Sequence, residues 1–145
     1  MIRKMIQKDT EQVYDMMKLF YQSPAVMIKA PEEILRKDIA DCVGECPYVD
    51  GYIFQIENEI IGYSMVARGY STEYGGECIW IEDLYIKDGY RGKNLSEQYF
   101  SFIENQYPSA VRFRLEVEEE NEPAVCAYKK NGYHFVAYKE MSKEC

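Results

Sequence analysis

The chain lacks most features that mark metal-binding, secreted and membrane proteins. Its 145 residues include one histidine and five cysteines, an odd number at irregular spacings. We therefore expect neither a zinc site nor a disulfide framework. No apolar run approaches the roughly 20 residues that span a bilayer, and the opening MIRKMIQKDTEQ does not read as a signal peptide. Reduced thiols, no metal and a cytoplasmic location are the expectation.

Basic residues are also scarce. Lys and Arg number 17 against 25 Asp and Glu, which gives a net charge of −8. Such a charge disfavours nucleic acid and anionic membranes as partners and mildly favours cationic ones. An anionic ligand would need a site that is locally positive.

Apolar and aromatic residues are plentiful. They make up 47% and 14% of the chain, and the length is that of one ordinary domain. No repeat, low-complexity stretch or linker interrupts the sequence. We therefore expect one domain over residues 1–145.

The hydrophobic spacing predicts a mixed α/β fold. The strand–helix–strand unit over residues 78–117 predicts a parallel crossover, whereas the short connections before it predict antiparallel pairing. The fold class is therefore α/β, with a mixed, mostly antiparallel sheet and flanking helices, in the order β-α-α-β-β-β-α-β-α-β. The expected elements are strand 1–7, helices from Asp9 and Pro31, strands 52–57, 60–68 and 78–86, a helix from Leu95, strand 111–117, a helix from Asn121 to Gly132, and strand 133–141.

One segment, DGYRGKNLSEQYF (88–100), has the composition of an anion site. A strand delivers a glycine-containing loop to the N-terminus of a helix, where unpaired amides and the positive end of the helix dipole meet. Arg91 and Lys93 add formal positive charge, so a pyrophosphate would suit this place. Neither GxxxxGK[ST] nor GxGxxG is present. From this segment alone, an ordinary solvated turn stays open.

Four segments together resemble the GNAT superfamily of N-acetyltransferases. They are IWIEDLYI (79–86), KDGYRGKNLS (87–96), VEEENEPAVCAYKKNGY (117–133) and the N-terminal strand with two helices. The IEDLY run looks like the polyamine and lysine-analogue acetyltransferases. The resemblance implies the GNAT acyltransferase fold and acetyl-coenzyme A as donor. It also implies direct acetyl transfer to a primary amine of a small molecule, or to a lysine-like or peptide acceptor.

The resemblance also implies roles for individual residues. The backbone of Leu84 and Ile86 would bind the pantetheine arm, and Asn121 would contact the cofactor. Tyr128 would protonate the leaving thiolate, although packing is the simpler explanation for one of 14 tyrosines. The loop that would hold the pyrophosphate consists of Arg91, Gly92, Lys93, Asn94, Leu95 and Ser96.

Two residues depart from the family pattern. Asn94 and Ser96 stand where glycines are usual, although Asn tolerates left-handed geometry and Ser is small. Asn94 and Glu97 also predict a capping box, which would occupy amides that a phosphate needs. A catalytically weak or inactive acyl-CoA-binding or regulatory module is therefore the alternative function, and an interaction domain without cofactor is a further one. A homodimer is left open.

Glu82 and Asp83 interrupt an otherwise apolar strand, where charge is costly without a purpose. Alternation would place Trp80, Glu82, Leu84 and Ile86 on one face and Asp83 and Tyr85 on the other. A bulge could instead turn both carboxylates toward a cleft. We expect Glu82 to act as general base through water and Asp83 to bind a cationic amine. An ordinary strand with one exposed acidic side stays open.

Overall fold

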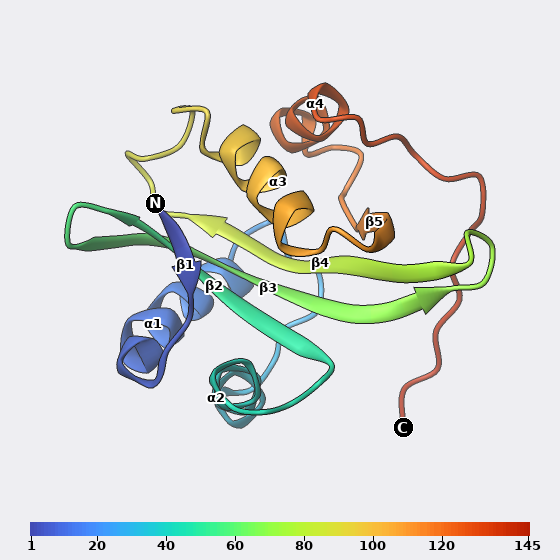
Figure 1. Ribbon diagram of the computed structural model, residues 1–145. Helices are drawn as coiled ribbons and strands as arrows, with labels where there is room; N and C mark the ends of the chain where they lie inside the picture. Colours follow the sequence, from blue (N-terminus) through green and yellow to red (C-terminus); the bar gives the residue numbers. More distant parts are fainter.

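The computed structural model describes residues 1–145 as one five-stranded sheet with helices on both faces (Figure 1). α1 and α2 cover one face, and α3 and α4 lie on the other. The elements, in chain order, are β1 (Ile2–Lys4), η1 (a 3-10 turn, Gln7–Asp9), α1 (Thr10–Tyr21), α2 (Glu32–Val43), β2 (Val49–Ile56), β3 (Glu59–Ser71), β4 (Gly76–Ile86), α3 (Leu95–Gln106), β5 (Ala110–Leu115) and α4 (Glu122–Lys130).

The strand order follows the chain, β1-β2-β3-β4-β5. The first three pairs are antiparallel, and β4 pairs with β5 in parallel. α3 makes the crossover between those two strands, as a parallel connection requires. The predicted fold class, a mixed and mostly antiparallel sheet with flanking helices, is therefore confirmed.

Each face of the sheet carries its own apolar core. Under α1 and α2, fully buried residues include Val13, Met17 and Ile39. Under α3 they include Ile61, Ile79 and Tyr99. Helical spacing supplies the first set and strand alternation much of the second, so the sequence pattern and the packing agree.

The last predicted strand does not form. The structure assigns no strand to residues 133–145, and Phe135, Val136, Tyr138 and Met141 are all exposed. The apolar residues of this segment run consecutively instead of alternating, so they define no single face for a sheet to bury. The prediction of a sixth strand is wrong.

Asp9, the residue from which the first helix is expected to begin, lies just before α1. Asp9 makes no side-chain cap for α1. Its carboxylate instead accepts two hydrogen bonds from Arg3, at 2.8 and 2.9 Å, and one from the Ile6 amide at 2.8 Å. These bonds tie β1 to the start of α1.

A β-bulge in β4 determines where the acidic residues lie. Met65 of β3 pairs with Asp83 and Val66 pairs with Ile81, so Glu82 is an extra residue in the ladder. Because of it, Ile81 and Leu84 both pack against the α3 core, while Tyr85 packs in the core under α1. The expected alternation of β4 is therefore confirmed from Asp83 to Ile86 but wrong for Trp80 and Glu82, where the alternative, a bulge, is present.

We expect the β3–β4 contact beside this bulge to tolerate no added methyl group. A Cβ on Gly62 would overlap the Tyr85 carbonyl oxygen and lie 2.8 Å from Ile86 Cδ1. Gly62→Ala should therefore lower the free energy of unfolding by about 1–3 kcal/mol, measured by denaturant titration. Gly69→Ala on the same strand is the matched control, because its nearest atom would be 3.8 Å away. Equal stability of the two variants would contradict the tight packing at Gly62.

Candidate active site

β4 has a free backbone edge beyond the bulge. Its parallel pairing with β5 ends at Ile81 and Leu115, whereas β4 continues to Ile86. Leu84 and Ile86, the residues predicted to bind pantetheine, lie on this unpaired stretch and are half-buried against the α3 core. The backbone groups of this stretch that do not face β3 are therefore available to a ligand.

The loop that follows β4 has the geometry expected of an anion-binding turn. Gly89, Gly92 and Asn94 have positive φ angles of 89°, 78° and 58°. Asn94 therefore adopts the left-handed conformation, which Asn tolerates better than most residues. It is the residue immediately before α3, so the turn brings the chain directly to the helix N-terminus.

The capping box predicted from Asn94 and Glu97 does not form. Asn94 makes no side-chain cap hydrogen bond. A capping side chain needs an extended backbone, and the left-handed conformation of Asn94 directs its amide group elsewhere. The first amides of α3 therefore have no partner within the protein. Open amides on a helix N-terminus are the donor set that a phosphate group requires.

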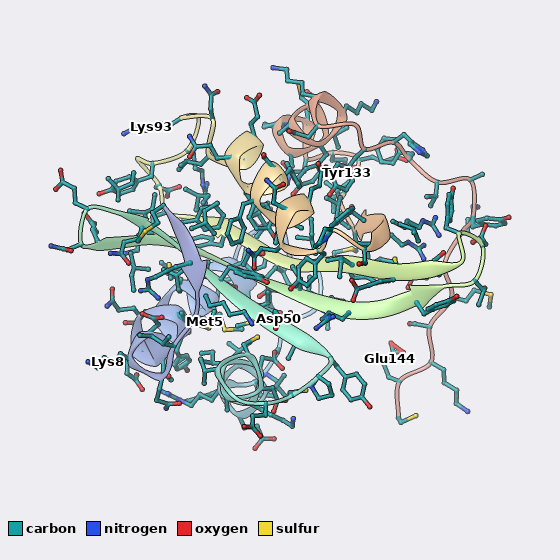
Figure 2. All side chains as sticks on the ribbon, viewed as in Figure 1. Met5, Lys8, Asp50, Lys93, Tyr133 and Glu144 are labelled. Atoms are coloured by element: carbon teal, nitrogen blue, oxygen red, sulfur yellow. The ribbon has the colours of Figure 1, made fainter.

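The two basic residues of the loop behave differently. The Nε of Arg91 donates to the Ile86 carbonyl at 2.8 Å, and its guanidinium pairs with Asp88 at 2.9 Å. Lys93 lies 5.4 Å from the Tyr90 ring centroid and forms no ion pair. Figure 2 shows Lys93 on the loop before α3, extending away from the sheet. The Lys93 ammonium is thus available to bind an anion. Arg91 would first have to give up its contact with the Ile86 carbonyl or with Asp88.

Tyr128 and Asn121 both belong to the helix facing α3. Asn121 is the residue before α4 and makes no side-chain cap. The Tyr128 ring packs edge-on against Phe100 at 5.8 Å and lies 6.2 Å from the Tyr133 ring. Figure 2 shows Tyr133 beside these helices. Burial raises the pKa of Tyr128, and no hydrogen bond contributes to that shift.

Asp83 is buried against the core under α1 and is 5% exposed. Tyr63 donates to its Oδ2 at 2.7 Å, and Tyr21 donates to its Oδ1 at 3.2 Å. Burial raises the pKa of Asp83 to about 6 even though both tyrosine hydrogen bonds favour the carboxylate. A direct contact between Asp83 and an acceptor would require one of these tyrosines to move.

Glu82 lies at the bulge, with much of the residue in solvent. The charged groups that shift its pKa are all acidic. Partial burial raises its pKa first, followed by the charges of Glu116, Asp83, Glu140 and Asp38. These carboxylates come from β4, α2, the segment after β5 and the C-terminal segment. Together they make this side of the bulge attractive to a cation.

Tyr21 and Tyr63, the partners of Asp83, are not indicated by any sequence pattern. Tyr63 lies one strand away and Tyr21 ends α1, 62 residues before Asp83. With 14 tyrosines in the chain, nothing in the sequence singles these two out. Only the register of β3 and β4 and the packing of α1 bring them together.

Other parts of the molecule offer no competing site of this kind. No three His, Cys, Asp or Glu side chains converge in a way that could hold a metal ion. None of the helices has both the length and the apolar character needed to cross a membrane. A shallow hollow of about 500 Å³ over α4 is lined by Glu119, Cys126 and Lys129 among others, and includes neither Glu82 nor Asn94.

Two known proteins are similar in sequence. The thialysine N-epsilon-acetyltransferases of Sus scrofa and Bos taurus are 30% and 28% identical over 122 residues. Each match covers 77% of this chain and 69% of the relative.

Solved structures agree on the fold. A possible acetyltransferase from Clostridium difficile 630 superposes with a TM-score of 0.83 at 19% identity, covering 100% of this chain and 97% of its own. The aminoglycoside N-acetyltransferase AAC(6')-Iy, in complex with CoA, gives 0.81 at 11% identity, with 99% and 93% covered. The sequence also matches the acetyltransferase (GNAT) family over residues 10–133. The chain therefore belongs to the acetyltransferase (GNAT) family and is an N-acetyltransferase, as the segments around β4, the α3 loop and α4 indicate.

Proposed function

We propose that the protein transfers the acetyl group of acetyl-coenzyme A directly to the amine of a cationic, lysine-like small molecule or peptide. The observation that carries this proposal is the position of the open α3 N-terminus beside the free edge of β4, with carboxylates at the bulge of the same strand. An anionic donor and a cationic acceptor would thus meet along one strand.

The donor would lie along β4 and end at α3. The pyrophosphate would bind the open amides of the loop, and Leu84 and Ile86 would bind the pantetheine arm through their backbone. Arg91 would leave the Ile86 carbonyl to make room and contact a phosphate instead. Acetyl-coenzyme A supplies the acetyl group as a reactive thioester. The loop residues concerned are Arg91, Gly92, Lys93, Asn94, Leu95 and Ser96, with Asn121 at the start of α4.

The acceptor would approach the acidic side of the bulge. An amine is mostly protonated near neutral pH, and the carboxylates around Glu82 would attract that form. The similarity to thialysine N-epsilon-acetyltransferases supports an acceptor with a terminal amine on a flexible chain. A net charge of −8 favours the same class of acceptor.

Two side chains would transfer protons during the reaction. Glu82 would accept the proton of the acceptor amine through water, and its raised pKa brings it closer to neutral pH than an ordinary carboxylate. Tyr128 would donate a proton to the leaving thiolate. Its raised pKa keeps the hydroxyl protonated at neutral pH, so the proton remains available to be donated.

The alternative of a weak or inactive acyl-CoA-binding module was motivated by Asn94, Ser96 and Glu97. The absence of a capping hydrogen bond at Asn94 removes one of its supports. Glu97 still adds a negative charge in the first turn of α3. Turnover separates this alternative from the proposed enzyme.

The direct test is thiol release from acetyl-coenzyme A with a panel of amines. We expect release with lysine analogues or polyamines, with mass spectrometry showing an acetylated amine. Neutral or anionic amines of similar size should react more slowly, because the acidic side of the bulge gives them no attraction. Cofactor binding without turnover for any amine would favour the inactive module.

Tyr128→Phe removes one hydroxyl and little volume. We expect kcat to fall by about 10²–10⁴-fold if Tyr128 is the proton donor, with little change in cofactor affinity. Tyr133→Phe is the matched control, because Tyr133 packs in the same aromatic group. Equal kcat for Tyr128→Phe and the wild type would show that water or another group supplies the proton.

A further inference from the structure

Asp83 is a buried carboxylate without a cation. No lysine or arginine pairs with it, and its two oxygens are held only by the hydroxyls of Tyr21 and Tyr63. Burying an uncompensated charge is costly, and a protein keeps such a group where the charge has a use. A cationic ligand close to Asp83 would supply the missing compensation.

Only one of the two tyrosines can meet a ligand. Tyr63 is fully buried in β3, with no exposed surface. Tyr21 is half-buried at the last position of α1, where the connection to α2 begins. The Tyr21 hydroxyl is therefore the route by which the charge of Asp83 can act on a molecule outside the core.

The groups around this pair come from every element packed against it. α2 contributes Asp38, whose charge raises the pKa of both Asp83 and Tyr21, and it also contributes the neutral thiol of Cys42. β4 contributes Glu82, which also raises the pKa of Tyr21. The charged side chains that shift the pKa of Tyr21 and Asp83 are all acidic, and the nearby Lys29 ammonium donates to the Tyr21 backbone carbonyl at 2.6 Å. An ammonium group at the Tyr21 hydroxyl would face three carboxylates.

We propose that Tyr21 and Asp83 act as a pair on the acceptor amine, with the Tyr21 hydroxyl in contact with the amine and Asp83 behind it. As an N–H proton of the ammonium passes to the Tyr21 oxygen, the hydroxyl proton of Tyr21 passes to Asp83 Oδ1. The ammonium becomes a neutral amine, the carboxylate becomes a carboxylic acid, and Tyr21 ends unchanged. This is the first of the two protons that the nitrogen loses; the second, lost after attack on the thioester, is the one that Glu82 would accept through water. The proton returns to water by the reverse route after the product leaves.

This inference deepens the proposed function and rests on it. Tyr21 is the catalytic residue of the pair, and Asp83 is a positioning residue that acts through Tyr21 and receives the proton. Burial raises the pKa of Asp83 to about 6, which is close enough to neutral pH for the carboxyl group to take up and release a proton during turnover. Asp83 thereby contributes to amine binding without leaving the core.

The kinetic test compares three tyrosine variants, using the amine that turns over best. Tyr21→Phe should lower kcat/KM by about 10²-fold across the pH range. Tyr63→Phe removes a hydrogen bond that stabilises the Asp83 carboxylate, so it should move the acidic limb of the kcat/KM profile to higher pH. Tyr14→Phe, on α1 but without contact to Asp83, should behave like the wild type. A Tyr21→Phe variant with wild-type kcat/KM and pH profile would overturn the proposal.

A second test needs no turnover. The pKa of Asp83 lies near 6 in the folded protein against 3.8 for a free carboxyl group. The native state therefore keeps a proton that the unfolded chain loses, and stability should fall as pH rises from about 4 to 6. Asp83→Asn should lack this component. The ratio of unfolding constants, wild type to variant, should rise about 10²-fold across that window.

The outcomes separate the two claims. A flat ratio would mean that the pKa of Asp83 is not raised toward neutral pH in the folded protein, and the proposal would be wrong. Turnover in the wild type with unchanged Tyr21→Phe kinetics would overturn the Tyr21–Asp83 pair but leave the proposed function standing. No acetylation of any amine by the wild type would overturn both.

Discussion

The extra residue at Glu82 in β4 is the constraint on which both sides of the candidate site depend. By inserting one residue against β3, the bulge reverses the alternation of the strand. Leu84 and Ile86 then face the α3 core, and Asp83 and Tyr85 face the core under α1. The same strand leaves β5 after Ile81, so its last residues present a free edge. One strand thus offers backbone to a donor and carboxylates to an acceptor.

The electrostatics of the site follow from this arrangement. The α3 N-terminus and Lys93 provide positive potential in a chain of net charge −8, and they do so at the point where the free edge of β4 ends. At the bulge, burial raises the pKa of Glu82 and Asp83, and nearby carboxylates, Asp38 among them, raise both pKa values further. The two regions have opposite sign, which suits the proposed transfer from an anionic donor to a cationic acceptor.

Much of the fold, and the conformation of the loop before α3, could be predicted from the sequence because both depend on local residue patterns. Strand and helix periodicity predicted the fold class, and the composition of the Arg91–Ser96 loop predicted an anion site there. Asn94 adopts the left-handed conformation that Asn tolerates better than most residues. The failures came from tertiary geometry. The Asn94 cap needed a backbone conformation that the loop does not adopt, and the strand at 133–141 has no alternating face. The pairing of Tyr21 with Asp83 joins residues 62 positions apart in the chain, and no local sequence pattern predicts such a contact.

The claim that β4 and the α3 N-terminus form one donor site is tested most directly by the affinity for acetyl-coenzyme A, measured by calorimetry. The account predicts binding that Arg91→Ala weakens about ten-fold or more, since a charge-assisted hydrogen bond contributes about 1.5–3 kcal/mol. Arg68→Ala, which removes an arginine paired with Glu77 at the far end of β3, should leave the affinity unchanged. Equal affinity of Arg91→Ala and the wild type, or no binding at millimolar cofactor, would contradict the account.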